Sequence, residues 1–93
     1  MYRVMKRDGA LAEFNIQKIS SVIQKAFDAQ KRQYHPSIID LLALKVTADF
    51  EPKIKNDIIQ VEEIQDSVES VLIQAGYADV AKAFILYRKQ REK

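Results

Sequence analysis

The stretch VMKRDG at residues 4–9, followed by FNIQKI at residues 14–19, decides how this chain begins to fold. Tyr2, Val4 and Lys6 would lie on one face of a strand, because side chains in a strand alternate with a period of two. The Asp-Gly pair then predicts a turn, since Gly tolerates a positive φ and Asp can hydrogen-bond the backbone just ahead of it. A β-hairpin is therefore expected at the start of the chain.

We expect residues 12–14 as the second strand of this hairpin, followed at once by a helix. Asn15 is a good N-cap, because its side-chain oxygen can accept a hydrogen bond from an otherwise unpaired backbone N–H. Lys6 and Arg7 at the hairpin tip, and Lys18 one turn into the helix, then lie near a helix N-terminus, where free N–H groups and the helix dipole favour anions. This pattern suggests a phosphate-binding site, although solvated charges explain most cations at turns.

Composition limits the class of protein. A length of 93 residues predicts one small domain, over residues 1–93. Of its side chains, 47% are hydrophobic and 30% are charged. The absence of cysteine excludes disulfides, thiolate metal sites and a thiyl radical within these residues. No apolar run is long enough to span a membrane and no leader segment is present, so we expect a cytoplasmic protein without a membrane partner. The net charge of +2 is too small to indicate nucleic acid.

Hydrophobic spacing predicts four helices. An apolar stripe with spacings of three and four residues predicts the first over residues 16–29. The second, over residues 36–50, begins with a proline and is apolar around most of its circumference, so we expect it to be the central helix of the core. The third runs over residues 62–75 and ends at Gly76, and the fourth runs over residues 79–91 with a cationic end.

Residues 58–60 have room only for a short third strand, which can pair with the N-terminal hairpin. The expected fold class is α+β, with a small sheet laid against a four-helix bundle.

The titratable residues give little sign of an enzyme. We interpret His35, the single histidine, as an ordinary loop residue. The carboxylates between residues 62 and 69 have spacings that suit a solvated helix face better than a paired acid and base. Glu62 and Asp66 could touch one metal ion, but a metal site needs more ligands than these. Because glycine-rich phosphate loops are absent too, we expect no catalysis and no metal site in this chain.

A binding role is more plausible. An apolar cleft between the sheet and the ends of the first, third and fourth helices could take a flat ring. Its walls would be Val4, Phe14, Ile19, Ile64 and Ile85. The cations that would meet an anionic tail are Lys6, Arg7, Lys18 and Lys89. Periodicity alone favours the alternative that these apolar residues are simply core.

Four blocks in order resemble the ATP-cone family over essentially the whole chain. They are VxKRDG at residues 4–9, FNxxKI at 14–19, VEEIQDxVE at 61–69 and AKAFIxYR at 81–88. ATP-cones are small regulatory domains that bind ATP or dATP, at the N-terminus of ribonucleotide reductases and in a zinc-ribbon repressor of reductase genes. The resemblance implies a four-helix bundle capped by a small three-stranded mixed β-sheet, which agrees with the fold expected above.

The resemblance also implies roles for single residues. Lys6, Arg7 and Lys89 match positions that hold phosphates, and Asn15 and Lys18 match positions facing the sugar and base. The residues that would wall the adenine are Val4, Phe14, Ile19, Ile64 and Ile85. Gln65 and Arg88 complete the expected nucleotide-binding set. Mg²⁺ would accompany the triphosphate, bound mainly by its oxygens and by waters.

Some positions depart from the family pattern. Val61 and Gln65 stand where some reductase cones carry threonine and histidine, which leaves discrimination between ATP and dATP open. The lack of cysteine argues against the repressor, and residues 76–88 look most like anaerobic, class III reductases. We therefore expect the N-terminal cone of such an enzyme, with the catalytic body and other cones as partners. The alternative is a protein-interaction or nucleic-acid-binding module that uses the basic C-terminal helix.

Overall fold

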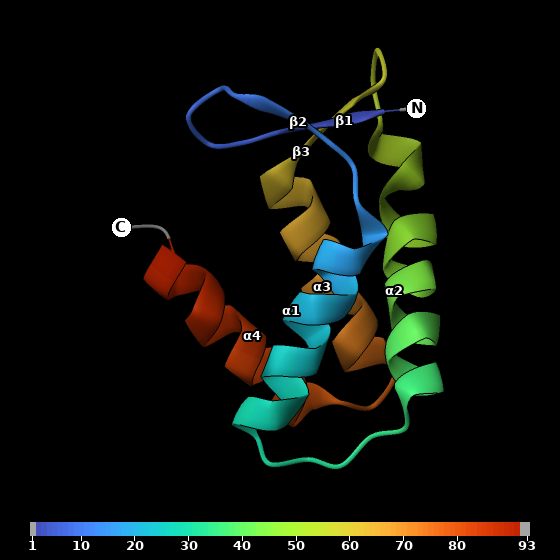
Figure 1. Ribbon diagram of the computed structural model, residues 1–93, viewed down its shortest axis with the longest axis vertical. Coiled ribbons are helices and arrows are strands. Elements are labelled where there is room, and N and C mark those ends of the chain that lie inside the picture. Colours follow the sequence, from blue (N-terminus) through green and yellow to red (C-terminus); the bar gives the residue numbers. More distant parts are fainter. Residues whose placement is uncertain (1, 92–93) are drawn as a thin grey trace.

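A small sheet closes one end of a helical bundle in the computed structural model, which describes residues 2–91 (Figure 1). Its three strands are β1 (Arg3–Met5), β2 (Leu11–Glu13) and β3 (Ile58–Gln60). β1 lies in the middle, antiparallel to β2 and parallel to β3. The expected α+β class and the mixed three-stranded sheet are therefore confirmed.

The hairpin turn forms as the Asp-Gly pair predicts. The N–H of Gly9 donates to the carbonyl of Lys6, and the N–H of Lys6 donates to the carbonyl of Ala10. Gly9 has a φ of +88°, the left-handed region that a three-residue hairpin loop needs at this place. The Asp8 carboxylate accepts a hydrogen bond from the N–H of Ala10 at 2.9 Å.

The second strand begins and ends one residue earlier than expected. The turn fixes the register with Met5 opposite Leu11 and Arg3 opposite Glu13, so the pairing ends before Phe14. Phe14 instead turns toward the bundle, where its ring packs against those of Tyr2 and Phe50.

The four helices are α1 (Ile16–Ala29), α2 (Pro36–Phe50), α3 (Val61–Gln74) and α4 (Ala78–Arg91). The first two have the predicted bounds. α3 starts and ends one residue before its predicted bounds, because it follows β3 directly, and α4 starts one residue early. A short 3₁₀ turn, Glu51–Lys53, follows α2 and contains Pro52, which disfavours the helical conformation of the residue before it.

Local hydrogen bonds explain several helix ends. The Asn15 side chain accepts from the N–H of Gln17 and caps α1, as predicted. At the end of α3, Tyr77 N–H donates to Leu72 O and Gly76 N–H donates to Ile73 O, with Gly76 at a φ of +90°. This is a Schellman motif, and it confirms Gly76 as the stop signal.

His35 lies in the loop before α2, as predicted, but it also has a structural role there. His35 is the N-cap of α2, and its Nδ1 accepts a hydrogen bond from the N–H of Ser37 at 3.2 Å. Histidine is not among the usual capping residues, so the sequence pattern gave no sign of this role.

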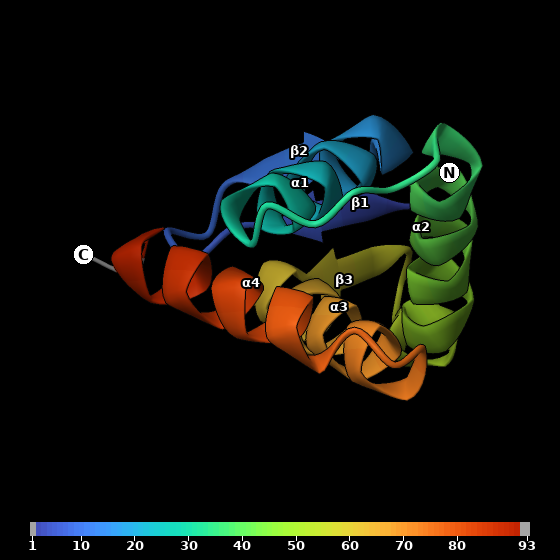
Figure 2. The same cartoon turned by 90° about the horizontal axis from the view of Figure 1, so that it is seen from below.

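The expectation that α2 is the central helix of the core is wrong. α2 packs mainly against α1 and α3, while α4 packs against α1 and α3 on the other side. Figure 2 shows α2 at one edge of the bundle. Leu41 and Leu44 remain 48% and 59% exposed, because a helix at an edge has a face that no neighbour covers.

Candidate functional site

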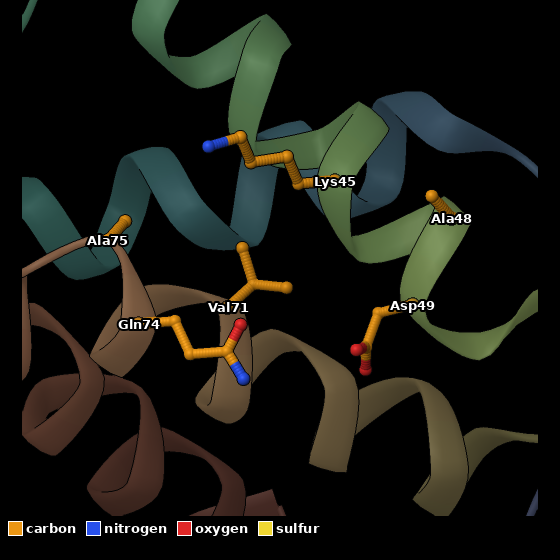
Figure 3. Close-up of a pocket in the computed structure, with 6 residues that line it drawn as sticks. All are labelled: Lys45, Ala48, Asp49, Val71, Gln74 and Ala75. Atoms are coloured by element: carbon orange, nitrogen blue, oxygen red, sulfur yellow. The ribbon is translucent and has the colours of Figure 1, made fainter.

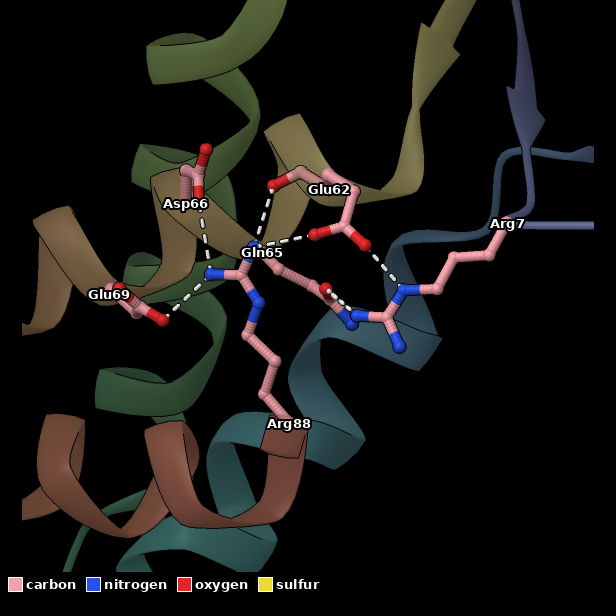
Figure 4. Close-up of polar contacts among 6 residues, drawn as sticks. All are labelled: Arg7, Glu62, Gln65, Asp66, Glu69 and Arg88. Atoms are coloured by element: carbon pink, nitrogen blue, oxygen red, sulfur yellow. Dashed lines mark hydrogen bonds and ion pairs between the residues drawn. The ribbon is translucent and has the colours of Figure 1, made fainter. Parts of the chain in front are cut away.

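Two arginines distant in the sequence meet on one carboxylate of α3 (Figure 4). Glu62 accepts a hydrogen bond from Nε of Arg7 through Oε1 and one from Nη2 of Arg88 through Oε2, the latter at 2.8 Å. Gln65, one turn along α3, accepts a second hydrogen bond from Arg7 at 3.0 Å. The hairpin, the start of α3 and the end of α4 are thus joined by side chains.

Arg88 is the most enclosed side chain of this network, at 13% exposure. Besides Glu62, its guanidinium contacts Glu69 at 2.7 Å and Asp66 at 2.9 Å. Burial alone would lower the pKa of Arg88, but the hydrogen bonds to Glu62, Glu69 and Asp66 outweigh it and raise that pKa. Hydrogen bonds from Arg88 and then Arg7 hold the pKa of Glu62 below its usual range. Both partners are therefore charged at neutral pH.

The remaining predicted cations are exposed. Lys6 lies at the hairpin turn, Lys18 in the first turn of α1, and Lys89 in the last turn of α4. Figures 1 and 2 both show the hairpin tip and the C-terminal end of α4 on the same side of the molecule. The structure thus brings the two basic segments of the sequence to one side.

Asn15 and Gln65 have part of their hydrogen-bonding capacity in use. The Asn15 oxygen caps α1, so a ligand at this position would meet the amide nitrogen, which can only donate. The Gln65 oxygen accepts from Arg7, which leaves the same kind of donor group on this side chain.

The five residues expected to wall an aromatic ring do not have equal exposure. Ile19 and Ile64 are buried in the hydrophobic core, so the alternative that they are core residues is right for these two. Val4, Phe14 and Ile85 are half-buried. Of these, Phe14 packs edge-to-face against Phe50 of α2.

Two of the hollows on the described surface lie away from these five residues. One, of about 510 Å³, lies between α2 and α3 and is lined in part by Lys45, Asp49 and Gln74 (Figure 3). A second lies between α1 and α4, beside Val22 and Tyr87. Neither is lined by the predicted wall residues, so the expected ring cleft does not coincide with either of these two hollows.

Three carboxylates of α3 hold Arg88, a role that the sequence pattern did not indicate. Glu62, Asp66 and Glu69 were interpreted as a solvated face, yet all three contact Arg88. Their spacing of four and three residues places them on one side of a helix, which is the signal that could have paired them with an arginine.

Among residues 2–91, histidines and acidic residues form no group of three or more arranged to hold a metal ion. In the same part of the chain, none of the helices has the length and apolar character that crossing a membrane requires.

Comparison with known proteins gives a consistent result. The model of the family described as "ATP cone domain" matches residues 2–93. A "Ribonucleoside-diphosphate reductase subunit alpha" of Chlamydia pneumoniae is 43% identical over 97% of this chain and 9% of that protein. A "Vitamin B12-dependent ribonucleoside-diphosphate reductase" of Thermoplasma acidophilum is 40% identical over 95% of the chain and 12% of the relative.

The expected likeness to anaerobic enzymes is present as well. An "Anaerobic ribonucleoside-triphosphate reductase" of Haemophilus influenzae is 33% identical over 98% of the chain and 13% of the relative. The chain thus spans about a tenth of the length of these relatives, which belong to three differently named kinds of reductase.

Proposed function

This chain belongs to the ATP-cone family, and from that premise we propose that it binds ATP or dATP and regulates the overall activity of a ribonucleotide reductase. Binding would act by shifting the conformation or assembly of the enzyme. The reductase chemistry would belong to the rest of the enzyme, since the relatives are about ten times longer than this chain. We propose an anaerobic enzyme as the parent, because residues 76–88 resemble class III reductases and one of the relatives is an anaerobic reductase.

The observation that carries this proposal is the joining of Arg7 and Arg88 through Glu62. It supports a common site for the hairpin and the end of α4, which the sequence places at opposite ends of the chain. Lys6 beside Arg7 and Lys89 beside Arg88 then add exposed cations around that common site. Phosphates need such a grouping, because each oxygen is best met by a charged donor.

We assign the phosphates to Lys6, Arg7 and Lys89, and the sugar and base to Lys18 and to the amide nitrogens of Asn15 and Gln65. The half-buried side chains of Val4, Phe14 and Ile85 would supply apolar contacts to adenine, with Ile19 and Ile64 packed beneath them. Arg88 would fix α4 on α3, because three carboxylates already hold its guanidinium. Mg²⁺ would enter with the triphosphate and be bound chiefly by phosphate oxygens and water.

The proposed partners are the catalytic body of the reductase and other copies of this domain. The alternative, a protein- or nucleic-acid-binding module built on the basic end of α4, has no support in the names of the relatives above. Arg88 at that end is also paired with acidic side chains, which weakens the positive charge offered to a nucleic acid.

The test is a calorimetric titration of ATP and of dATP, with and without Mg²⁺, into the folded chain. We expect dissociation constants on the order of micromolar for at least one of them. Lys6→Ala and Lys89→Ala should each weaken binding about tenfold, because each removes a charged phosphate contact. Lys45→Ala, an exposed lysine on α2, is the matched control and should bind as the parent does.

A folded parent that binds neither nucleotide at millimolar concentration would refute the proposed function. Equal losses in all three variants would refute the site assignment alone, because they would reflect net charge and not position.

A further inference from the structure

We propose that Glu62 is an internal competitor for the phosphate groups of the nucleotide, holding Arg7 until the phosphates displace it. This inference rests on the proposed function and adds a residue that opposes binding at the same site. Glu62 is not one of the residues assigned to the nucleotide above, and its part emerges only from the contacts in Figure 4.

The first step is the geometry of Arg7. Its Nε donates to Glu62 and one Nη donates to Gln65 at 3.0 Å. A guanidinium binds carboxylates and phosphates through the same planar fork of N–H groups. A phosphate that takes the Nε of Arg7 must therefore remove the Glu62 carboxylate from it.

The second step is the charge around this point. Two guanidinium groups, on Arg7 and Arg88, face three carboxylates, on Glu62, Asp66 and Glu69, so these five side chains sum to one negative charge. An incoming triphosphate is repelled by that excess as long as Glu62 remains charged. The lowered pKa of Glu62 keeps it so at neutral pH.

Exposure and remaining partners indicate which of the two arginines Glu62 releases when phosphate binds. Arg88 is 13% exposed and keeps Asp66 and Glu69 as partners if Glu62 moves. The side chains of Arg7 and Glu62 are 32% and 47% exposed, so solvent and ligand reach this pair more easily. We therefore assign the exchange to Arg7, with Glu62 remaining attached to Arg88 through its other oxygen.

The experiment compares Glu62→Gln with Glu63→Gln in the 93-residue chain. The two variants change the net charge equally and lie next to each other in the first turn of α3, but Glu63 makes none of the ion pairs that join Arg7 and Arg88 to this helix. We expect Glu62→Gln to bind ATP about two- to fivefold more tightly than Glu63→Gln, since an exposed ion pair opposing the ligand has been removed.

Titrations with inorganic triphosphate and with adenosine distinguish two explanations of a gain in affinity. One is the loss of competition for the phosphate groups, and the other is a structural change of the domain. The gain in affinity should appear with inorganic triphosphate and be absent with adenosine, which carries no phosphate. Thermal unfolding of both variants shows whether each remains folded at the titration temperature.

Equal affinities of the two variants for ATP and triphosphate, or weaker binding by Glu62→Gln, would overturn the inference while leaving the proposed function intact. Absence of ATP binding in the parent and in both folded variants would overturn the proposed function, and the inference with it.

Discussion

The ring of Phe14 packs edge-to-face against the ring of Phe50, with their centroids 5.7 Å apart and their planes at 71°. Phe14 follows β2 and Phe50 ends α2, so this pair attaches the sheet to a helix that lies at the edge of the bundle. Tyr2 completes the cluster, with its ring 4.8 Å from Phe14 and 6.0 Å from Phe50. Besides any contact with a nucleotide, Phe14 therefore has a structural role.

Phe14→Ala should lower the free energy of unfolding by about 2 kcal/mol, because it removes a half-buried aromatic ring and two ring–ring contacts. Leu11→Ala is the control, since Leu11 is an apolar residue of the same hairpin with an exposed side chain and should cost less than about 0.5 kcal/mol. Urea denaturation followed by circular dichroism measures both. Equal losses would show that the aromatic cluster contributes nothing beyond a generic apolar contact.

Arg88→Met should destabilise the fold by about 1–2 kcal/mol, because it leaves Glu62, Asp66 and Glu69 close together without their shared cation. Lys82→Met removes the same charge from an exposed position of the same helix and should change stability by less than about 0.5 kcal/mol. The comparison uses urea midpoints at low ionic strength. A neutral Arg88→Met variant would mean that the carboxylates relax into solvent without cost.

Lys31→Gly should stabilise the chain by about 0.5–1 kcal/mol. Lys31 has a φ of +54° just after α1, where the N–H of Arg32 donates to the carbonyl of Phe27, as in a helix end that favours glycine. The same substitution inside α1, Lys25→Gly, should destabilise by about 1 kcal/mol, because glycine is a poor helix former. If the melting temperatures of Lys31→Gly and Lys25→Gly change in the same direction, the end of α1 does not favour glycine at position 31.

Acid should weaken the fold in part through Glu62. Hydrogen bonds from Arg88 and Arg7 lower its pKa in the folded chain, so the folded state binds this proton less readily than the unfolded chain. The resulting stability is present above the unfolded pKa and is lost as the pH falls through the folded one. Urea midpoints of the parent should therefore fall more between about pH 6 and pH 3 than those of Glu62→Gln, because only the parent carries this carboxyl group.

If the urea midpoints of the parent and of Glu62→Gln fall equally with pH, the contacts of Glu62 with Arg7 and Arg88 do not contribute to stability. Glu63→Gln, which removes one negative charge at the neighbouring position of α3, is the control for net charge.

Much of the fold could be predicted because its signals are short-range. Periodicity predicts α1, a proline marks the start of α2, and the strand at Ile58–Gln60 lies where the sequence predicts it. The position of α2 could not be predicted in this way. An apolar circumference shows that a helix can be covered on several sides, but whether it is covered depends on how the other helices pack.

The sequence predicts which residue types form the candidate site, but it does not predict how their side chains pair in space. The basic segments at the two ends of the chain do lie on one side of the molecule. The ion pairs of Arg7 and Arg88 could not be predicted, because periodicity describes one helix at a time. The pairing of Arg88 with α3 does not follow from spacing within one helix, whereas the burial of Ile19 and Ile64 is what their helical spacing favours.

The sequence by itself determined the turns and caps of this protein. Gly9 and Gly76 adopt positive φ, and Asn15 caps the helix that follows it, because each depends on hydrogen bonds within a few residues. Only the tertiary structure placed Glu62 between Arg7 and Arg88, which are 55 and 26 positions away from it. Such contacts depend on how the hairpin, α3 and α4 pack together, because packing alone brings side chains so distant in sequence within hydrogen-bonding reach.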